Sequence, residues 1–177
     1  MKKVFAIVCL FIAFLFIYFL QADFFSWFTI AGIKPNLFVI FILFIGLFAG
    51  KKIGVFLGLI LGIFLDLLIG RTVGMSGILL AIIGFLGEYF DKNFSKESRF
   101  TIMLMVFGCT LFYEIGLYIF YLFRLSISFE LYSFAKILLV EALYNTIIVI
   151  IIYPLIQKAG YALENTFKVK NILTRYF

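Results

Sequence analysis

Three carboxylates lie inside long apolar stretches of the chain, where ionisable side chains are rare. They are Asp66, Glu114 and Glu141, and Asn145 follows Glu141 by about one helical turn. Charged groups are costly inside a bilayer, so they face the interior of a helix bundle and pair with other polar groups. These four residues predict an interior polar cluster, which could conduct ions or protons, hold a ligand, or simply join helices. Three basic residues are expected on the same side of the membrane as Asp66 and could pair with it: Arg71, Arg124 and Lys136.

The residue types argue against an enzyme. Histidine is absent, which excludes histidine bases, histidine metal ligands and the Ser-His-Asp arrangement. Asp66 is the only aspartate well inside an apolar stretch, so an intramembrane aspartyl protease would lack its second carboxylate. Cys9 and Cys109 do not have metal-ligand spacing, and no phosphate-binding glycine loop or nucleophile motif is present. We expect no catalysis, no cofactor and no metal, although a mechanism that uses only Glu114 or Glu141 stays open.

Small residues recur at every fourth position through the same region. The series is Gly46, Gly50, Gly54, Gly58 and Gly62, followed by Asp66, Gly70 and Gly74. In lipid there is no hydrophobic force between helices, and small residues at this spacing let another helix backbone approach closely. The series therefore predicts a helix-packing face, which could receive either a neighbouring span of this chain or a helix of a partner protein.

Composition identifies the kind of element that must position these residues. The chain is 66% hydrophobic and 14% charged, with a mean hydropathy of +1.22, far from the roughly 25% charged residues of a soluble domain. We predict one all-helical transmembrane domain, a bundle of six spans followed by a basic cytoplasmic tail. Pro35 and Asn36 form the motif at the start of the second span. The predicted spans are residues 4–20, 37–50, 53–69, 75–90, 100–123 and 137–156, and the tail is residues 157–177.

The basic residues predict the orientation of the bundle. With six spans, eleven of them fall on the side of the N-terminus and four on the other, which places both termini in the cytoplasm under the positive-inside rule. The net charge of +6 is then explained by this loop bias, and no nucleic acid is expected as a partner. The tail is either a basic helix lying on anionic lipid or a plain anchor. The larger set is Lys2, Lys3, Lys51, Lys52, Lys92, Lys96, Arg99, Lys158, Lys168, Lys170 and Arg175; the smaller is Lys34, Arg71, Arg124 and Lys136.

Three motifs in the first half of the chain resemble a known family. Lys34-Pro35-Asn36-Leu37 precedes an apolar span, a glycine-spaced span ends in Asp66-Leu67-Leu68, and Gly84-Phe85-Leu86-Gly87 follows. Together they resemble the family of rod shape-determining proteins MreD, from about Lys34 to Phe90. The resemblance implies a non-enzymatic subunit of the bacterial elongation machinery in the inner membrane. Its implied partners are MreC above all, then RodA, the penicillin-binding transpeptidase and MreB.

The same resemblance implies a bundle similar to the substrate-binding subunits of energy-coupling-factor vitamin transporters. Those subunits share the six-span, glycine-rich first half. This supplies an alternative function, a membrane subunit that binds a small molecule such as a vitamin.

Overall fold

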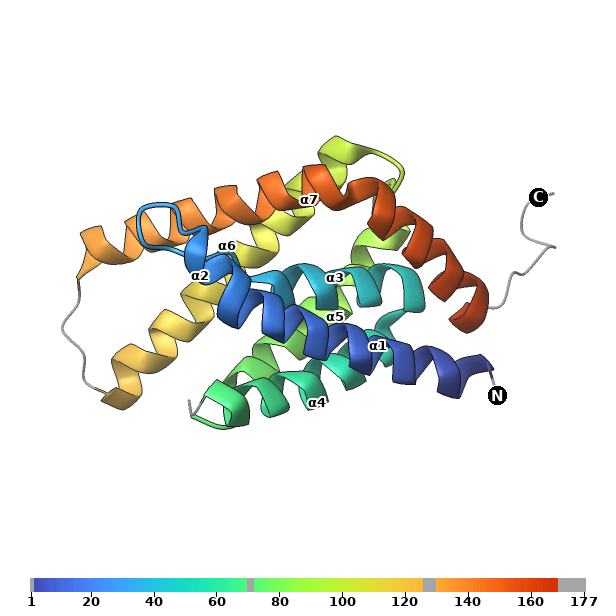
Figure 1. Cartoon of the computed structure of the whole chain (residues 1–177), viewed down its shortest axis with the longest axis horizontal. Helices are drawn as coiled ribbons and strands as arrows, with labels where there is room; N and C mark the ends of the chain where they lie inside the picture. Colours follow the sequence, from blue (N-terminus) through green and yellow to red (C-terminus); the bar gives the residue numbers. More distant parts are fainter. Residues whose placement is uncertain (1, 70–71, 126–129, 169–177) are drawn as a thin grey trace.

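A computed structural model describes residues 2–69, 72–125 and 130–168, and these residues are almost entirely helical (Figure 1). The prediction of an all-helical protein is confirmed, since the described residues contain no β-strand. One isolated bridge, between Ile30 and Ile33, closes the turn that precedes α3. The elements are α1 (Lys2–Phe19), a π-helix η1 (Leu20–Phe24), α2 (Phe25–Trp27), α3 (Leu37–Ala49), α4 (Lys51–Ile69), α5 (Met75–Asn93), α6 (Arg99–Leu125) and α7 (Leu131–Phe167).

Four helical stretches of the described residues are long and apolar enough to cross a membrane. The α3 helix is apolar but has only 13 residues, which rise about 20 Å against a hydrocarbon core of about 30 Å. The lengths and apolar composition of these helices are therefore those of a helical membrane protein, whereas the count of six spans stays a prediction. The four stretches are Lys2–Trp27, Lys51–Ile69, Arg99–Arg124 and Leu131–Phe167.

The short helix α3 forms the centre of the molecule. Its sequence is apolar on every side, which is typical of a helix that lies in a protein core or in a membrane. All of its residues except Phe41 are buried, and it contacts α1, α4, α5, α6 and α7. In Figure 1 it lies behind α1 and between α7 and α4.

The long helix α7 continues beyond the predicted end of its span. It runs to Phe167, so residues 157–167 of the predicted tail are helical. Pro154 lies inside the helix, where it has no N–H for the usual hydrogen bond and its ring displaces the preceding turn. Figure 1 shows α7 changing direction towards its end. The bend brings Gly160 against the ring of Phe48 at the end of α3.

The chain reverses at two opposite ends of the molecule. One end holds the start of α1, the turn between α3 and α4, and the end of α7 (Figure 1). The other end holds α2, the end of α4 and the start of α7. Buried polar residues lie towards the second end, and a cluster of ion pairs lies at the first.

Candidate functional site

The glycines of α4 lie against the backbone of α5. A Cβ atom built on Gly58 would lie 2.6 Å from the carbonyl oxygen of Leu80, and one on Gly62 would lie 2.5 Å from Cα of Gly77. A Cβ on Gly54 would lie 2.7 Å from the carbonyl oxygen of Gly84. Real Cβ atoms do not approach backbone this closely. At these three positions the packing partner is a helix of this same chain.

Helix α5 also contributes glycines to these contacts. Gly84 packs against Gly54 of α4 and against Gly46 of α3, so three helices meet at glycine backbones. A Cβ on Gly87 would lie 2.6 Å from the carbonyl oxygen of Leu43 in α3. The motif Gly84-Phe85-Leu86-Gly87 therefore supplies the α5 side of these glycine contacts. The recurrence of Gly77, Gly84 and Gly87 at steps of seven and three is the signal in the sequence that could have identified α5 as the partner.

Two members of the four-residue series serve as turns instead. Gly50 has φ +91° between α3 and α4, and Gly74 has φ +100° just before α5. These values lie in the left-handed region that glycine adopts without strain. No atom lies within 4 Å of a Cβ built on Gly74, so that position is not a packing contact. Gly70 lies outside the described residues.

Asp66 caps the start of α5. Its Oδ2 atom accepts hydrogen bonds from the backbone N–H groups of Gly74, at 2.9 Å, and Ser76, at 3.1 Å. The Asp66 side chain is 1% exposed, and N–H groups at a helix start have no partner within their own helix. The hydroxyl of Tyr113 in α6 donates to Ser76 Oγ at 3.1 Å. The carboxylate therefore joins α4 to α5, and Ser76 joins α5 to α6.

Two of the three expected cation partners of Asp66 do not pair with it. Asp66 forms no ion pair with Arg124 or Lys136, and Arg71 lies outside the described residues. Backbone N–H groups meet the carboxylate because α4 and α5 are joined by a short turn, which brings the start of α5 directly beside the end of α4.

Asn145 caps the start of α3 in the same way, by accepting a hydrogen bond from a backbone N–H group. Its Oδ1 accepts the backbone N–H of Asn36 at 2.8 Å, and its Nδ2 donates to Thr110 Oγ1 at 2.9 Å. The next N–H, that of Leu37, donates to Gln21 Oε1 at 3.0 Å. Asn145 and Thr110 are fully buried. Side chains of η1 and α7 thus supply the cap that Asn36, at the N-cap position, does not supply with its own side chain.

Glu114 and Glu141 lie in a third setting. They line a cavity of about 350 Å³ together with Gln21, Lys34 and Tyr113, between η1, the loop before α3, α6 and α7. Asp66 and Asn145 do not line this cavity. The four predicted polar residues are thus divided among two helix caps and one cavity, and the hypothesis of a single cluster describes only the two glutamates.

A cluster of ion pairs lies at the opposite end of the molecule. Its lysines were predicted only as part of the bias of basic residues, and the ion pairs themselves were not predicted. Lys96 lies 2.8 Å from Asp91 Oδ1 and 2.7 Å from Glu164 Oε1, and Lys168 lies 2.5 Å from Asp91 Oδ2. The ammonium group of Lys168 also donates to the carbonyl oxygen of Leu47 at 2.7 Å. These contacts join the ends of α3, α5 and α7. No local pattern reveals most of them, because the partners are more than 60 residues apart in sequence except for Asp91 with Lys96 and Glu164 with Lys168.

The ion pairs shift the titration of their members, which lie beyond the predicted end of the fourth span. Burial acts to raise the pKa of Asp91, but hydrogen bonds from Lys168 and Lys96 outweigh it and hold that pKa below its ordinary value. Burial acts to lower the pKa of Lys96, and Asp91 and Glu164 outweigh it and raise that pKa. Both charged forms are therefore favoured by folding.

This cluster predicts an acid-sensitive contribution to stability. A carboxyl with a depressed pKa stabilises the fold above its unfolded-state pKa of about 3.9, and that contribution is lost as the pH falls through the folded-state value. Asp91→Asn should lower the free energy of unfolding by about 1–3 kcal/mol at pH 7. The difference in this free energy between the variant and the wild type should shrink as the pH falls below about 4. Thermal unfolding in detergent between pH 3 and 8 measures both. Asp23→Asn, at an exposed site, should match wild type throughout. An Asp91→Asn deficit of equal size at pH 3 and pH 7 would contradict this account.

The fold and these contacts define a helical membrane protein whose buried polar groups and glycines hold its helices together. The family model of the rod shape-determining protein MreD matches residues 1–159. Since this match covers most of the 177 residues, the chain belongs to the MreD family, as the sequence motifs predicted. None of the curated proteins and none of the solved structures compared with the chain matches it.

Proposed function

We propose that this protein is a non-enzymatic membrane scaffold of the cell-elongation machinery, which binds MreC and thereby regulates peptidoglycan synthesis and rod shape. Membership of the rod shape-determining family MreD is the observation that carries the proposal. The contacts of the buried polar groups support it, because Asp66 and Asn145 are used for helix caps. RodA, the penicillin-binding transpeptidase and MreB are the further partners of this scaffold.

The glycine contacts limit where a partner helix binds. The glycine face of α4 is covered by α5 at Gly54, Gly58 and Gly62, so MreC binds to other, lipid-facing surfaces of the bundle. Bulky substitutions on the α4 glycines therefore act on the fold first. A loss of MreC after such a change would not locate the interface.

We further propose that the protein lies in the inner membrane with both termini in the cytoplasm. The end of the molecule that holds the start of α1 and the end of α7 (Figure 1) also holds the turn with Lys51 and Lys52. Arg124 and Lys136 lie at the end of α6 and near the start of α7, at the opposite end. This distribution agrees with the positive-inside rule.

Depletion in a rod-shaped host tests the function. We expect cells to round and swell as the protein is lost, and to recover when the wild-type chain is expressed. Purification of the chain in mild detergent should recover MreC. These results follow because a scaffold acts only through what it binds.

The transporter alternative predicts a different set of results. Depletion would create a vitamin requirement, cells would keep their shape when the vitamin is supplied, and the purified protein would carry the vitamin with an ATPase-linked membrane partner. Normal rods after full depletion, together with a stoichiometric bound vitamin, would contradict the scaffold proposal.

A further inference from the structure

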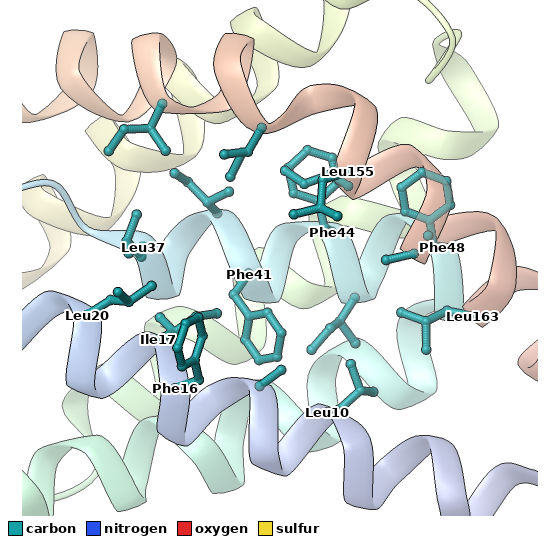
Figure 2. A pocket seen from close by; sticks show the side chains of 18 of the residues that line it. Leu10, Phe16, Ile17, Leu20, Leu37, Phe41, Phe44, Phe48, Leu155 and Leu163 are labelled. Carbon is teal, nitrogen blue, oxygen red and sulfur yellow. The ribbon is translucent and has the colours of Figure 1, made fainter.

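An apolar groove runs between α1 and α7, with α3 as its floor. Figure 2 shows Leu10 and Ile17 on one side, Leu155 and Leu163 on the other side, and Phe41 between them. Every residue that lines it is apolar, and its volume is about 410 Å³. The groove exists because α1 is only loosely attached, with Leu10 and Phe14 as its buried residues.

A basic pocket lies next to one end of the groove, at the end of the molecule where α1 starts, although no residue lines both. On α1, Lys3 and Ile7 line the pocket, and Leu10 and Ile17 line the groove. Steps of three, four and seven residues place these side chains on one face of the helix. On α7, Leu163 lines the groove and Phe167, one turn later, lines the pocket. The pocket has a volume of about 520 Å³.

The pocket carries an excess of positive charge. Its two carboxylates are already paired, Glu88 with Lys92 at 2.7 Å and Asp91 with Lys168 at 2.5 Å. Its remaining lysines are exposed and form no ion pair with any described residue. They are Lys3, Lys51 and Lys52. Three unpaired ammonium groups at the mouth of an apolar groove are complementary to a ligand with an anionic head and a hydrocarbon tail.

The dimensions of the groove fit a hydrocarbon chain better than a protein helix. The residues that line it from Leu10 in α1 to Leu20 at the start of η1 rise about 15 Å. Spread over that length, a volume of about 410 Å³ corresponds to a cross-section of about 27 Å². A helix about 10 Å across with its side chains has a cross-section of about 79 Å². The groove is therefore too narrow to enclose a whole helix.

We propose that this groove and pocket bind one anionic phospholipid of the leaflet that faces Lys3, Lys51 and Lys52. An acyl chain lies along α3 between α1 and α7, and the phosphate lies among the three lysines. The bound lipid fills the space that α1 leaves open and so ties α1 to the bundle. This site is independent of MreC.

Native mass spectrometry of the purified chain in detergent tests the headgroup contact, with dioleoyl-phosphatidylglycerol and dioleoyl-phosphatidylcholine as the probes. We expect one phosphatidylglycerol to bind more tightly than phosphatidylcholine. Lys3→Gln with Lys52→Gln should weaken phosphatidylglycerol binding about 25-fold, since each lysine near an anionic lipid contributes about five-fold. The control pair, Lys2→Gln with Lys158→Gln, removes the same charge outside the pocket and should leave binding within about two-fold.

The acyl-chain contact is tested on α7 with two exposed alanines. Ala159 lines the groove and Ala162 does not. Ala159→Leu should reduce the binding of both lipids several-fold by filling the groove, and Ala162→Leu should not. Because both positions are exposed, neither change should prevent folding, and thermal unfolding without added lipid checks this.

Three outcomes would overturn the proposal. One is equal binding of the two lipids by the wild-type chain, and another is an equal loss in the two lysine pairs. The third is a wild-type complex whose extra mass is a polypeptide that Ala159→Leu releases, which would assign the groove to a partner helix.

Discussion

Replacing Gly58 with leucine is expected to abolish most of the folded protein. The Cβ atom alone would lie 2.6 Å from the carbonyl oxygen of Leu80, with the next atoms of α5 at 2.8 and 2.9 Å. These are backbone atoms, so no side-chain rotation relieves the contact, and α5 must move away from α4. The cost should exceed the 1–3 kcal/mol typical of an overpacked core. The yield of monodisperse protein and its thermal unfolding in detergent measure the effect.

Gly108→Leu is the matched control for this change. Gly108 is exposed on α6, and no atom lies within 4 Å of a Cβ built there. Leucine also has the higher helix propensity, by up to about 1 kcal/mol, so the variant should be at least as stable as wild type. If Gly58→Leu and Gly108→Leu were equally stable, the close contact of α4 with α5 would be wrong.

Replacing Asp66 with leucine should be the second most damaging change. It removes the acceptor for the N–H groups of Gly74, which is part-buried, and of Ser76, which is buried. A buried, unsatisfied polar group costs about 1–3 kcal/mol, so Ser76 alone should lower the free energy of unfolding by about that amount, and Gly74 should add to the loss. Thermal unfolding in detergent, together with the protease sensitivity of the turn before α5, measures this loss.

Asp66→Asn separates a structural role from an ionic one. The amide oxygen of asparagine can accept the same two hydrogen bonds, so the variant should keep at least half of the stability that leucine loses and should support normal cell shape. A well-folded Asp66→Asn protein that fails to support rod shape would show that the charge itself is needed. That result would favour the ion or proton path that the sequence left open.

The local sequence is sufficient to determine the class of protein and most of its helices. Hydropathy and charge are properties of neighbouring residues, and they predicted the helical membrane class without reference to any contact. The motifs around Asn36, Asp66 and Gly84 likewise predicted the family over the first half of the chain. The family model extends that match to residue 159.

The end of α7 shows what local reasoning left open. Hydropathy falls after residue 156, where we predicted the end of the span, and the tail beyond it was expected to be either a basic helix on lipid or a plain anchor. The helix nevertheless continues to Phe167, because its last turns pack on the end of α3 through Gly160 and Phe48. A contact between residues 112 positions apart is not visible in a local window.

The roles of individual residues within the glycine series were decided by tertiary structure. A repeat of four identifies small residues, but it does not separate a packing contact such as Gly58 from a turn such as Gly50, which has φ +91°. The partner helix also depends on how α4 and α5 cross. Asp66 was correctly expected to face the interior, but its partners are backbone N–H groups at the start of the next helix.

The ion cluster and the groove depend on tertiary structure most strongly. Asp91 and Glu164 share Lys96 only because the bend in α7 returns its end towards α5. The groove between α1 and α7 is the space left after the helices have packed, and no residue or spacing encodes such a space by itself. The sequence alone therefore determined which residues had to be inside a helical membrane protein. The packing of its helices decided which of those residues meet, because the contacts join positions that are distant along the chain.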